Sequence, residues 1–133
     1  MRPSLSVITG TVNRPDALRA MLDSVAADAA PLATDGSLGG VEVVIVAGAV
    51  SPLDKLDHAI AGISLFEPGV RVLVEPQLGG WTRAFNAAAA YSSGEALLWL
   101  NDDCEIRPGT LRACIDFVRE HKHDLGAVPW RDP

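Results

Sequence analysis

Four short apolar segments, separated by stretches with helical periodicity, dominate the pattern of hydrophobic and polar positions along the chain. These segments are bounded by turn residues and predict strands over residues 5–9, 41–46, 70–74 and 95–100, of which 41–46 and 95–100 are expected to be buried. The intervening stretches predict helices that begin near residues 15, 52, 78 and 108. Strands that alternate with helices in this way predict an α/β domain spanning 1–133, with a mostly parallel Rossmann-like sheet, flanking helices and right-handed crossovers.

Details of the helical stretches sharpen this prediction. Asn13 is expected to cap the first helix, since Pro15 suits the first helical turn. The apolar stripe of that helix predicts core positions at Leu18, Met21, Leu22 and Val25. Residues 31–40 predict a polar, glycine-rich loop, and residues 126–130 predict one further short strand. His58 is expected to be a surface histidine of the second helix.

Composition and charge narrow the class of protein. The 133 residues, 48% of them apolar and 21% charged, are typical of one globular domain. The formal net charge of −6 argues against a nucleic-acid partner held by phosphate contacts. We expect no transmembrane segment, because no apolar run approaches about 20 residues. The N-terminus is interpreted as a strand and not as a signal peptide, and Cys104 and Cys114 as unpaired thiols of a cytoplasmic protein.

The polar triplet Asn101-Asp102-Asp103 follows directly on the fourth predicted strand. Ligands of open α/β sheets bind just outside the carboxyl ends of strands, which is where this triplet falls. Adjacent carboxylates repel one another and lose hydration when covered, and a divalent cation would relieve both costs. An alternative stays open, in which the triplet is a polar turn whose Asp103 or Asn101 caps the next helix. No GxGxxG follows the first strand, which disfavours a dinucleotide-binding fold.

Three motifs in order resemble the N-terminal, nucleotide-binding half of family 2 glycosyltransferases, which have the GT-A fold. Residues 6–18 with 21–25 resemble the opening strand, the Thr-x-Asn-Arg loop and the first helix of that family. Residues 80–86 are similar to its Gly-x-x-x-Ala-x-Asn motif. Residues 97–111 are similar to its metal-binding strand, with the DxD-type triplet at 101–103. The resemblance covers about the whole chain, and it implies a truncated GT-A-like domain whose acceptor-binding half would follow Pro133.

The resemblance also implies roles for particular residues. Asp103 would coordinate Mn²⁺ or Mg²⁺ together with Asp102, which with Asn101 would also contact the ribose or a metal-bound water. The remaining residues of the donor site would be Thr11, Asn13, Arg14, Gly80, Ala84 and Asn86. The implied reaction is transfer of a sugar from a nucleotide-diphosphate sugar to an unknown acceptor. The metal would neutralise charge on the leaving diphosphate.

Two departures from the family pattern keep other functions open. The turn at residues 47–51 lacks the carboxylates that contact the base in this family. No general base can be assigned, so a catalytic residue stays unknown, and a partner subunit or a second copy is expected to complete the enzyme. The alternatives are a non-catalytic binding or assembly module, and a metal-dependent nucleotide-sugar hydrolase or nucleotidyl-transfer enzyme on a similar sheet.

Overall fold

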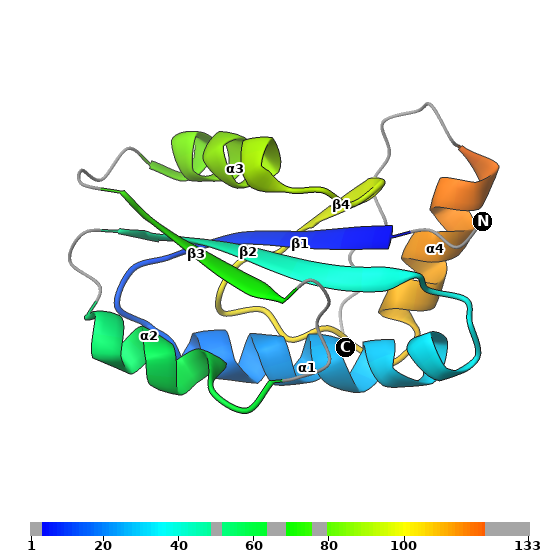
Figure 1. The fold of residues 1–133 in the computed structure, drawn as a ribbon, viewed down its shortest axis with the longest axis horizontal. Coiled ribbons are helices and arrows are strands. Elements are labelled where there is room, and N and C mark those ends of the chain that lie inside the picture. The colour runs from blue at the N-terminus through cyan, green and yellow to red at the C-terminus, as the bar shows by residue number, and fades with distance from the viewer. Residues whose placement is uncertain (1–3, 49–51, 64–68, 76–79, 122–133) are drawn as a thin grey trace.

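Four parallel strands form one sheet in the order β3-β2-β1-β4. The protein is described here from a computed structural model that covers residues 4–48, 52–63, 69–75 and 80–121. The strands are β1 (Ser4–Thr11), β2 (Gly40–Gly48), β3 (Val70–Glu75) and β4 (Ala96–Trp99). All three strand pairs are parallel, so the four carboxyl ends lie along one edge of the sheet, at the left in Figure 1. The predicted α/β class and the parallel sheet are confirmed.

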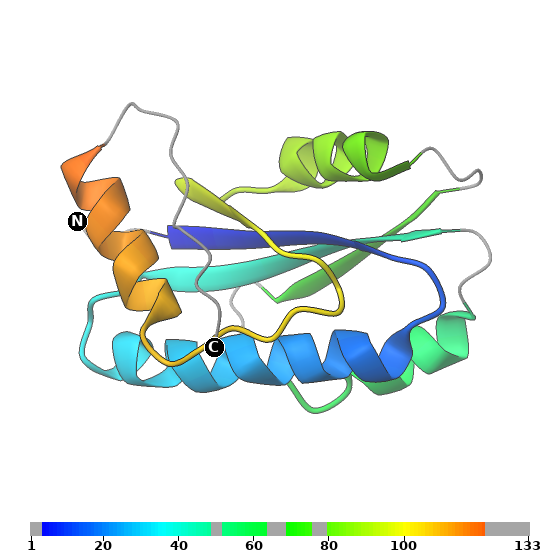
Figure 2. The same cartoon turned by 180° about the vertical axis from the view of Figure 1, so that it is seen from behind.

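Helices cover both faces of this sheet. They are α1 (Pro15–Thr34), α2 (Leu53–Ile60), α3 (Gly80–Tyr91) and α4 (Thr110–Glu120). Figure 1 shows α1 and α2 on one face and α3 alone on the other, with α4 standing beside the far end of α1. Seen from behind in Figure 2, the segment after β4 crosses from the sheet to α1 before α4 begins. This segment leads from the polar triplet, which follows β4, to the α1 side of the sheet.

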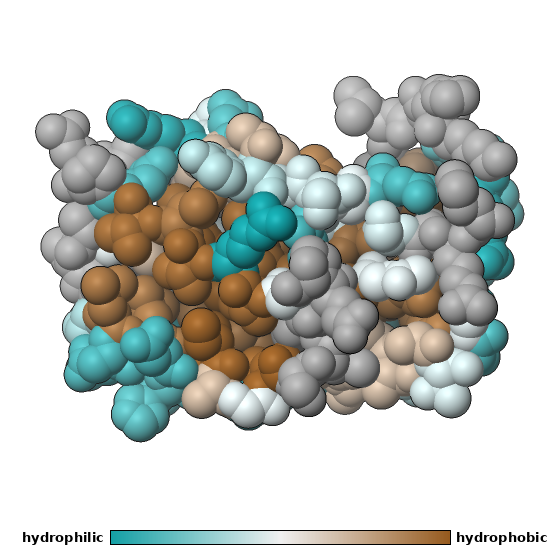
Figure 3. Space-filling view, viewed as in Figure 1, coloured by the Kyte–Doolittle hydropathy of each residue, from teal (hydrophilic) through white to brown (hydrophobic). Residues whose placement is uncertain are grey.

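The central strands supply most of the core. Every residue of β1 after Ser4 is buried, as is every residue of β2 after Gly40, because helices cover both of their faces. The edge strands differ: Leu97 and Trp99 of β4 are 50% and 59% exposed. The prediction that the fourth strand is buried on both faces is therefore wrong, because an apolar run alone does not show which strand lies at the edge. Figure 3 shows a similar band of apolar residues over the other edge strand, β3.

The first helix is longer than predicted. It continues through Pro31 to Thr34, where a loop was expected, so that part of the loop prediction is wrong. Pro31 removes one intrahelical hydrogen bond, but buried Leu32 holds the last turn against the core. The predicted cap is also wrong: Arg14 occupies the N-cap position, and Asn13 before it has a φ of 50°.

The last helix begins at Thr110, two residues after the predicted start at Pro108. Its free N–H groups are satisfied from α1: the Asp28 carboxylate accepts hydrogen bonds from the N–H of Gly109 at 2.9 Å and of Leu111 at 2.8 Å. An acidic side chain at a helix N-terminus also suits the helix dipole. Asp28 thereby fixes the end of the segment that starts at the polar triplet. The predicted strand at residues 126–130 lies outside the described residues.

A buried carboxylate fastens the beginning of β4 to the two central strands. Glu42 of β2 is 2% exposed and accepts hydrogen bonds from the Ser6 hydroxyl, at 2.6 Å, and from the Ser93 N–H. The Ser6 hydroxyl in turn accepts from the Gly94 N–H at 2.7 Å. Burial alone would raise the pKa of Glu42, but these donors and the Arg71 guanidinium outweigh it and lower that pKa. The charged carboxylate is thus the form that the fold stabilises.

Gly94 leaves no room for a side chain, and Gly94→Ala is expected to destabilise the protein by about 3 kcal/mol. A methyl group there would lie 2.5 Å from the Ser6 Oγ, 2.6 Å from the Ser6 N and 2.8 Å from the Leu5 C, two of which are backbone atoms. Gly62→Ala is a matched control, because nothing lies within 4 Å and only its φ of +75° opposes the change. For this control, urea denaturation should show a loss of about 1 kcal/mol in the free energy of unfolding. Equal losses in both variants would contradict the steric argument.

Two further features concern the thiols and the helices. Cys104 and Cys114 are both free thiols, as predicted, and burial raises the pKa of Cys114, with the Asp28 charge as a second cause. Among the residues that the structure describes, no helix combines the length and apolar character needed to cross a membrane.

Candidate functional site

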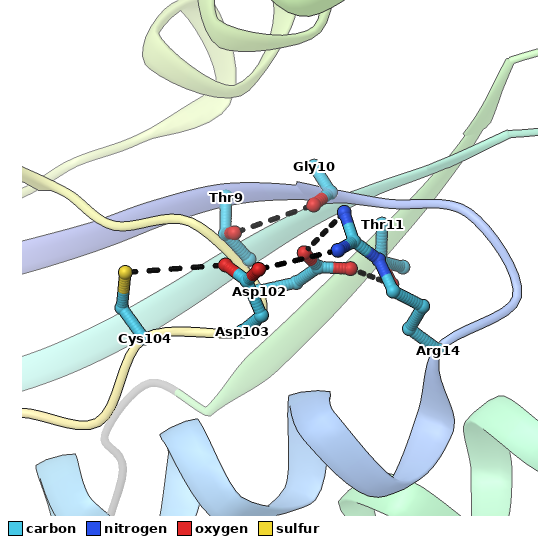
Figure 4. Close-up of polar contacts among 7 residues, drawn as sticks. All are labelled: Thr9, Gly10, Thr11, Arg14, Asp102, Asp103 and Cys104. Atoms are coloured by element: carbon cyan, nitrogen blue, oxygen red, sulfur yellow. Dashed lines mark hydrogen bonds and ion pairs between the residues drawn. The ribbon is translucent and has the colours of Figure 1, made fainter.

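The polar triplet lies beside the end of β1, because β1 pairs directly with β4. Asp102 follows β4 and is fully buried, and its Oδ2 accepts a hydrogen bond from the Thr11 hydroxyl at 2.8 Å. These two residues are 91 positions apart in the sequence. Figure 4 shows Asp102 pointing toward Thr11, the last residue of β1, and both Asp102 and Asp103 pointing toward Arg14 of the loop that follows. The structure therefore brings four of the predicted site residues together.

Arg14 lies between the two aspartates. Its guanidinium is 2.9 Å from the Asp102 Oδ1 and donates a hydrogen bond to the Asp103 Oδ2 at 3.3 Å (Figure 4). The Asp103 side chain is 52% exposed, whereas that of Asp102 has no exposure. The Arg14 guanidinium thus pairs with one buried and one exposed carboxylate, and its positive charge screens the repulsion between them.

The buried carboxylate carries an electrostatic cost. Burial raises the pKa of Asp102, the hydrogen bond from Thr11 and the charge of Arg14 lower it, and the Asp103 charge raises it. The net effect is a raised pKa, so ionised Asp102 is less stable in the fold than in water. Its Oδ1 receives no hydrogen bond of acceptable geometry, although Arg14 lies at ion-pair distance. The site consequently holds an excess of negative charge that an additional cation would relieve.

The donor atoms fit a divalent cation that is shared with a substrate. Within the described ranges, no group of three or more His, Cys, Asp or Glu side chains is arranged to hold a metal by itself. Mg²⁺ is commonly held by one or two carboxylates with substrate phosphates completing its shell. Asp103, with its exposed oxygens, and the neighbouring Asp102 match that smaller set. A cation bound there would compete with the Arg14 guanidinium for the same oxygens.

A cavity of about 170 Å³ lies between the carboxyl ends of three strands and the start of α3, and neither aspartate is among the residues that line it. Thr11 connects the two places, because it lines the cavity and also donates to Asp102. Gly10 lets α3 approach: a methyl group there would lie 3.1 Å from the Trp81 ring and 3.3 Å from the Ala84 Cβ. The lining is mostly apolar and consists of Gly10, Thr11, Val12, Val46, Gly48, Glu75, Gly80, Trp81 and Ala84.

The other predicted site residues are distributed around this centre. Gly80 and Ala84 line the cavity. Asn13 is exposed in the loop after β1, and Asn86 is exposed on α3 outside the set of residues that line the cavity. Asn101 is exposed, and its carbonyl accepts a hydrogen bond from the Cys104 N–H at 3.2 Å, which closes the turn that presents the aspartates.

Two of the lining residues that were not assigned to the site from the sequence have side chains suited to binding a ligand. Glu75 is the last residue of β3, and the rule that places ligands at carboxyl ends of strands could have found it. Trp81 lies in the first turn of α3, inside a motif that was recognised only for its small residues and its asparagine. A carboxylate and an indole ring therefore belong to the candidate site.

A second, wider hollow of about 360 Å³ lies between α1 and α2. His58 is exposed on its rim, as predicted for a surface histidine, and both Asp16 and Lys55 also line it. Thr11 and Trp81 are not part of its lining, whereas both line the smaller cavity, and Thr11 also donates a hydrogen bond to Asp102. The smaller cavity therefore remains the candidate site.

Comparison with solved structures identifies proteins of the same fold. The chain superposes on S. aureus TarS residues 1–349 with a TM-score of 0.72 and 23% identity, covering 98% of this chain and 39% of that one. It superposes on the mannosyltransferase PcManGT from Pyrobaculum calidifontis, solved with GDP-Man and Mn²⁺, with a TM-score of 0.68 and 23% identity, covering 89% and 33%. TarS 1–349 in complex with UDP gives 0.65 and 23%, covering 92% and 33%. These likenesses establish the GT-A fold.

The chain spans less than two fifths of the length of these structural relatives. No curated protein matched the sequence. The family assignment comes from the sequence itself, which matches glycosyl transferase family 2 over residues 6–132. That match covers nearly the whole chain and includes both segments that meet at the candidate site. The chain belongs to glycosyl transferase family 2.

Proposed function

We propose that this domain binds a nucleotide-diphosphate sugar through a divalent cation, Mn²⁺ or Mg²⁺, and that it provides the donor half of a glycosyl transfer. The main support is the meeting of Asp102 and Asp103 with Arg14 at the carboxyl end of the sheet, beside a mostly apolar cavity. Such an edge is where ligands of open α/β sheets bind. The arrangement offers carboxylates for a cation and a guanidinium for phosphate oxygens.

Each residue has a task in this proposal. Asp103 contributes its exposed carboxylate to the cation, and the negative charge of the buried Asp102 also attracts the cation. Arg14 is 44% exposed and can turn from the carboxylates to the diphosphate, for which a planar guanidinium is well suited. Thr11 keeps Asp102 in place through its hydroxyl. When bound, the metal would supply Lewis-acid stabilisation of charge on the leaving diphosphate.

We assign the acceptor and its general base to a segment or subunit other than the described residues. The chain corresponds to 39% of TarS 1–349, so relatives of this fold have considerably more chain in which to place them. A positioned base contributes roughly 10²–10⁴-fold to such a step. The domain alone is therefore expected to bind its donor well but to transfer sugar slowly. A cytoplasmic location and self-association remain predictions.

One observation favours the alternative of a non-catalytic binding or assembly module. The Arg14 guanidinium pairs with both aspartates and neutralises part of their charge. A domain that had lost donor binding could keep this ion-paired cluster for stability alone. Binding of metal and nucleotide separates the two functions, because only a working donor site requires the cation and the diphosphate together.

Isothermal titration calorimetry of the 133-residue protein with UDP, GDP, ADP and CDP, with and without Mn²⁺, tests the proposal. We expect at least one nucleotide to bind in the presence of Mn²⁺ and to lose most of its affinity in EDTA. Absence of binding for all four would contradict the proposal and support the non-catalytic module. Release of free sugar from a bound nucleotide sugar, without any acceptor, would instead indicate the hydrolase.

A further inference from the structure

The cavity beside the aspartates has one aromatic wall. Trp81 lies against the backbone at the end of β1: a methyl group at Gly10 would be 3.1 Å from its Cζ3, which is a tight contact. The ring also stacks on Phe85, with centroids 5.8 Å apart and planes 23° apart. These contacts limit the orientations of the indole while leaving it 45% exposed. A flat, partly exposed ring that is already held in place suits stacking against another flat ring.

The cavity also has one carboxylate. Among the described residues that line it, Glu75 is the only acidic one, and its side chain is only 15% exposed. The Nε of Arg83 lies 3.7 Å from the Glu75 Oε1, which is an ion pair too long for a hydrogen bond. The carboxylate therefore keeps strong acceptor capacity toward a ligand. The turn after β2 lacks a carboxylate, and Glu75 provides one from the neighbouring strand.

A carboxylate presents two acceptors side by side, so it pairs best with two adjacent N–H donors. Guanine has such a pair on one edge, its ring N–H and its amino group. Uracil has one ring N–H between two carbonyl oxygens, which would face the carboxylate unfavourably. Adenine and cytosine place an acceptor nitrogen beside their amino group. The chemistry of the cavity therefore discriminates among bases, with guanine favoured.

We propose that Glu75 selects the base of the bound nucleoside diphosphate, that this base is guanine, and that its ring packs on Trp81. The inference rests on the proposed function, because it assigns the base within that donor site. Val12 and Val46 complete the apolar surroundings in which a charged acceptor discriminates strongly. The diphosphate then extends past Thr11, which borders both the cavity and the aspartates.

The test is a comparison of GDP, UDP, ADP and CDP binding in Mn²⁺ by calorimetry, for the native protein and Glu75→Gln. We expect GDP to bind roughly 10- to 100-fold more tightly than the other three. Glu75→Gln should remove that preference by weakening GDP, since an amide offers one acceptor and one donor in place of two acceptors. The control is Glu120→Gln, whose side chain on α4 is 75% exposed and far from the cavity, and it should change nothing.

Several results would overturn the base assignment. Equal affinities for the four nucleotides, or a preference for UDP, would exclude guanine selection. These affinities are measured on the native protein, so this part of the test does not depend on whether a variant folds. A GDP preference that persists in Glu75→Gln would show that Glu75 does not select the base. Failure of the proposed function is a different result, in which no nucleotide binds the native protein in Mn²⁺.

Discussion

Asp103→Asn is expected to abolish the Mn²⁺-dependent part of nucleotide-diphosphate binding, with a loss of at least about 100-fold in affinity. The amide is a weaker ligand for a divalent cation, because it carries no charge and has one oxygen in place of two, while its size and shape are nearly those of the carboxylate. Calorimetry with GDP in Mn²⁺ and in EDTA measures the effect. Residual affinity in the variant should equal that of the native protein in EDTA, because Arg14 and the cavity remain intact.

The structure offers a matched control for this change. Asp116→Asn removes the same charge from an exposed position of α4, on the side of the fold remote from the cavity, and should leave binding unchanged. Stability should move by less than about 0.5 kcal/mol in both variants, since Asp103 is 52% exposed and its ion pair with Arg14 is partly solvated. Metal-dependent binding that persists in Asp103→Asn would show that this carboxylate is not a ligand.

Arg14→Met is expected to destabilise the fold by about 1–3 kcal/mol at neutral pH. Removing one partner of a buried ion pair costs about 3–5 kcal/mol. The loss expected here is smaller because Arg14 is 44% exposed to solvent, which weakens the pair. The variant leaves the fully buried Asp102 carboxylate with the Thr11 hydroxyl but without its cation. The pKa of Asp102, already raised by burial, should rise further because the charge of Arg14 lowers it in the native protein.

The sign of the pH dependence follows from that raised pKa. A carboxyl group whose pKa is higher in the folded state binds its proton more tightly there, so stability falls as pH rises through the interval between the unfolded and folded values. The deficit of Arg14→Met against the native protein should therefore be largest at neutral pH. It should shrink as acidification protonates Asp102.

Urea denaturation of the native protein, Arg14→Met and Arg119→Met between about pH 4 and pH 8 measures this difference. Arg119 is an exposed residue in the last turn of α4, so its replacement should give a small effect without the same pH profile. A deficit for Arg14→Met that stays constant with pH would mean that lost packing, and not the charge on Asp102, explains it. An unchanged stability would mean that Arg14 is free to serve a ligand alone.

Much of this fold could be predicted from periodicity. The central strands are rich in apolar residues, although Ser6 and Thr9 interrupt β1 and Glu42 interrupts β2, and such segments between helical stretches indicate a parallel sheet. The placement of Asp102 and Asp103 at a carboxyl end followed from the same pattern. Local signals failed where tertiary contacts decide: Pro31 indicated a loop, but the burial of Leu32 extends the helix through it.

The composition of the site was less accessible, because it depends on strand order. Thr11 and Asp102 meet only because β4 adds to the outer side of β1, a neighbour relation that no local pattern encodes. Glu75 reaches the cavity because β3 pairs with β2. Arg14 was predicted to line the donor site through its motif, but its double contact with the aspartates required their relative positions in space.

The attachment of β4 to β1 at both ends has a consequence for how the domain folds. At one end the Ser6 hydroxyl meets the Gly94 N–H, and at the other the Thr11 hydroxyl meets Asp102, across separations of 88 and 91 residues. Closing loops of that length is slow, because the chain loses conformational entropy before the contacts that compensate for this loss have formed. The first three strands can associate earlier through shorter connections. The aspartate cluster, and with it the chemistry of the domain, is therefore expected to form late in folding, after most of the sheet.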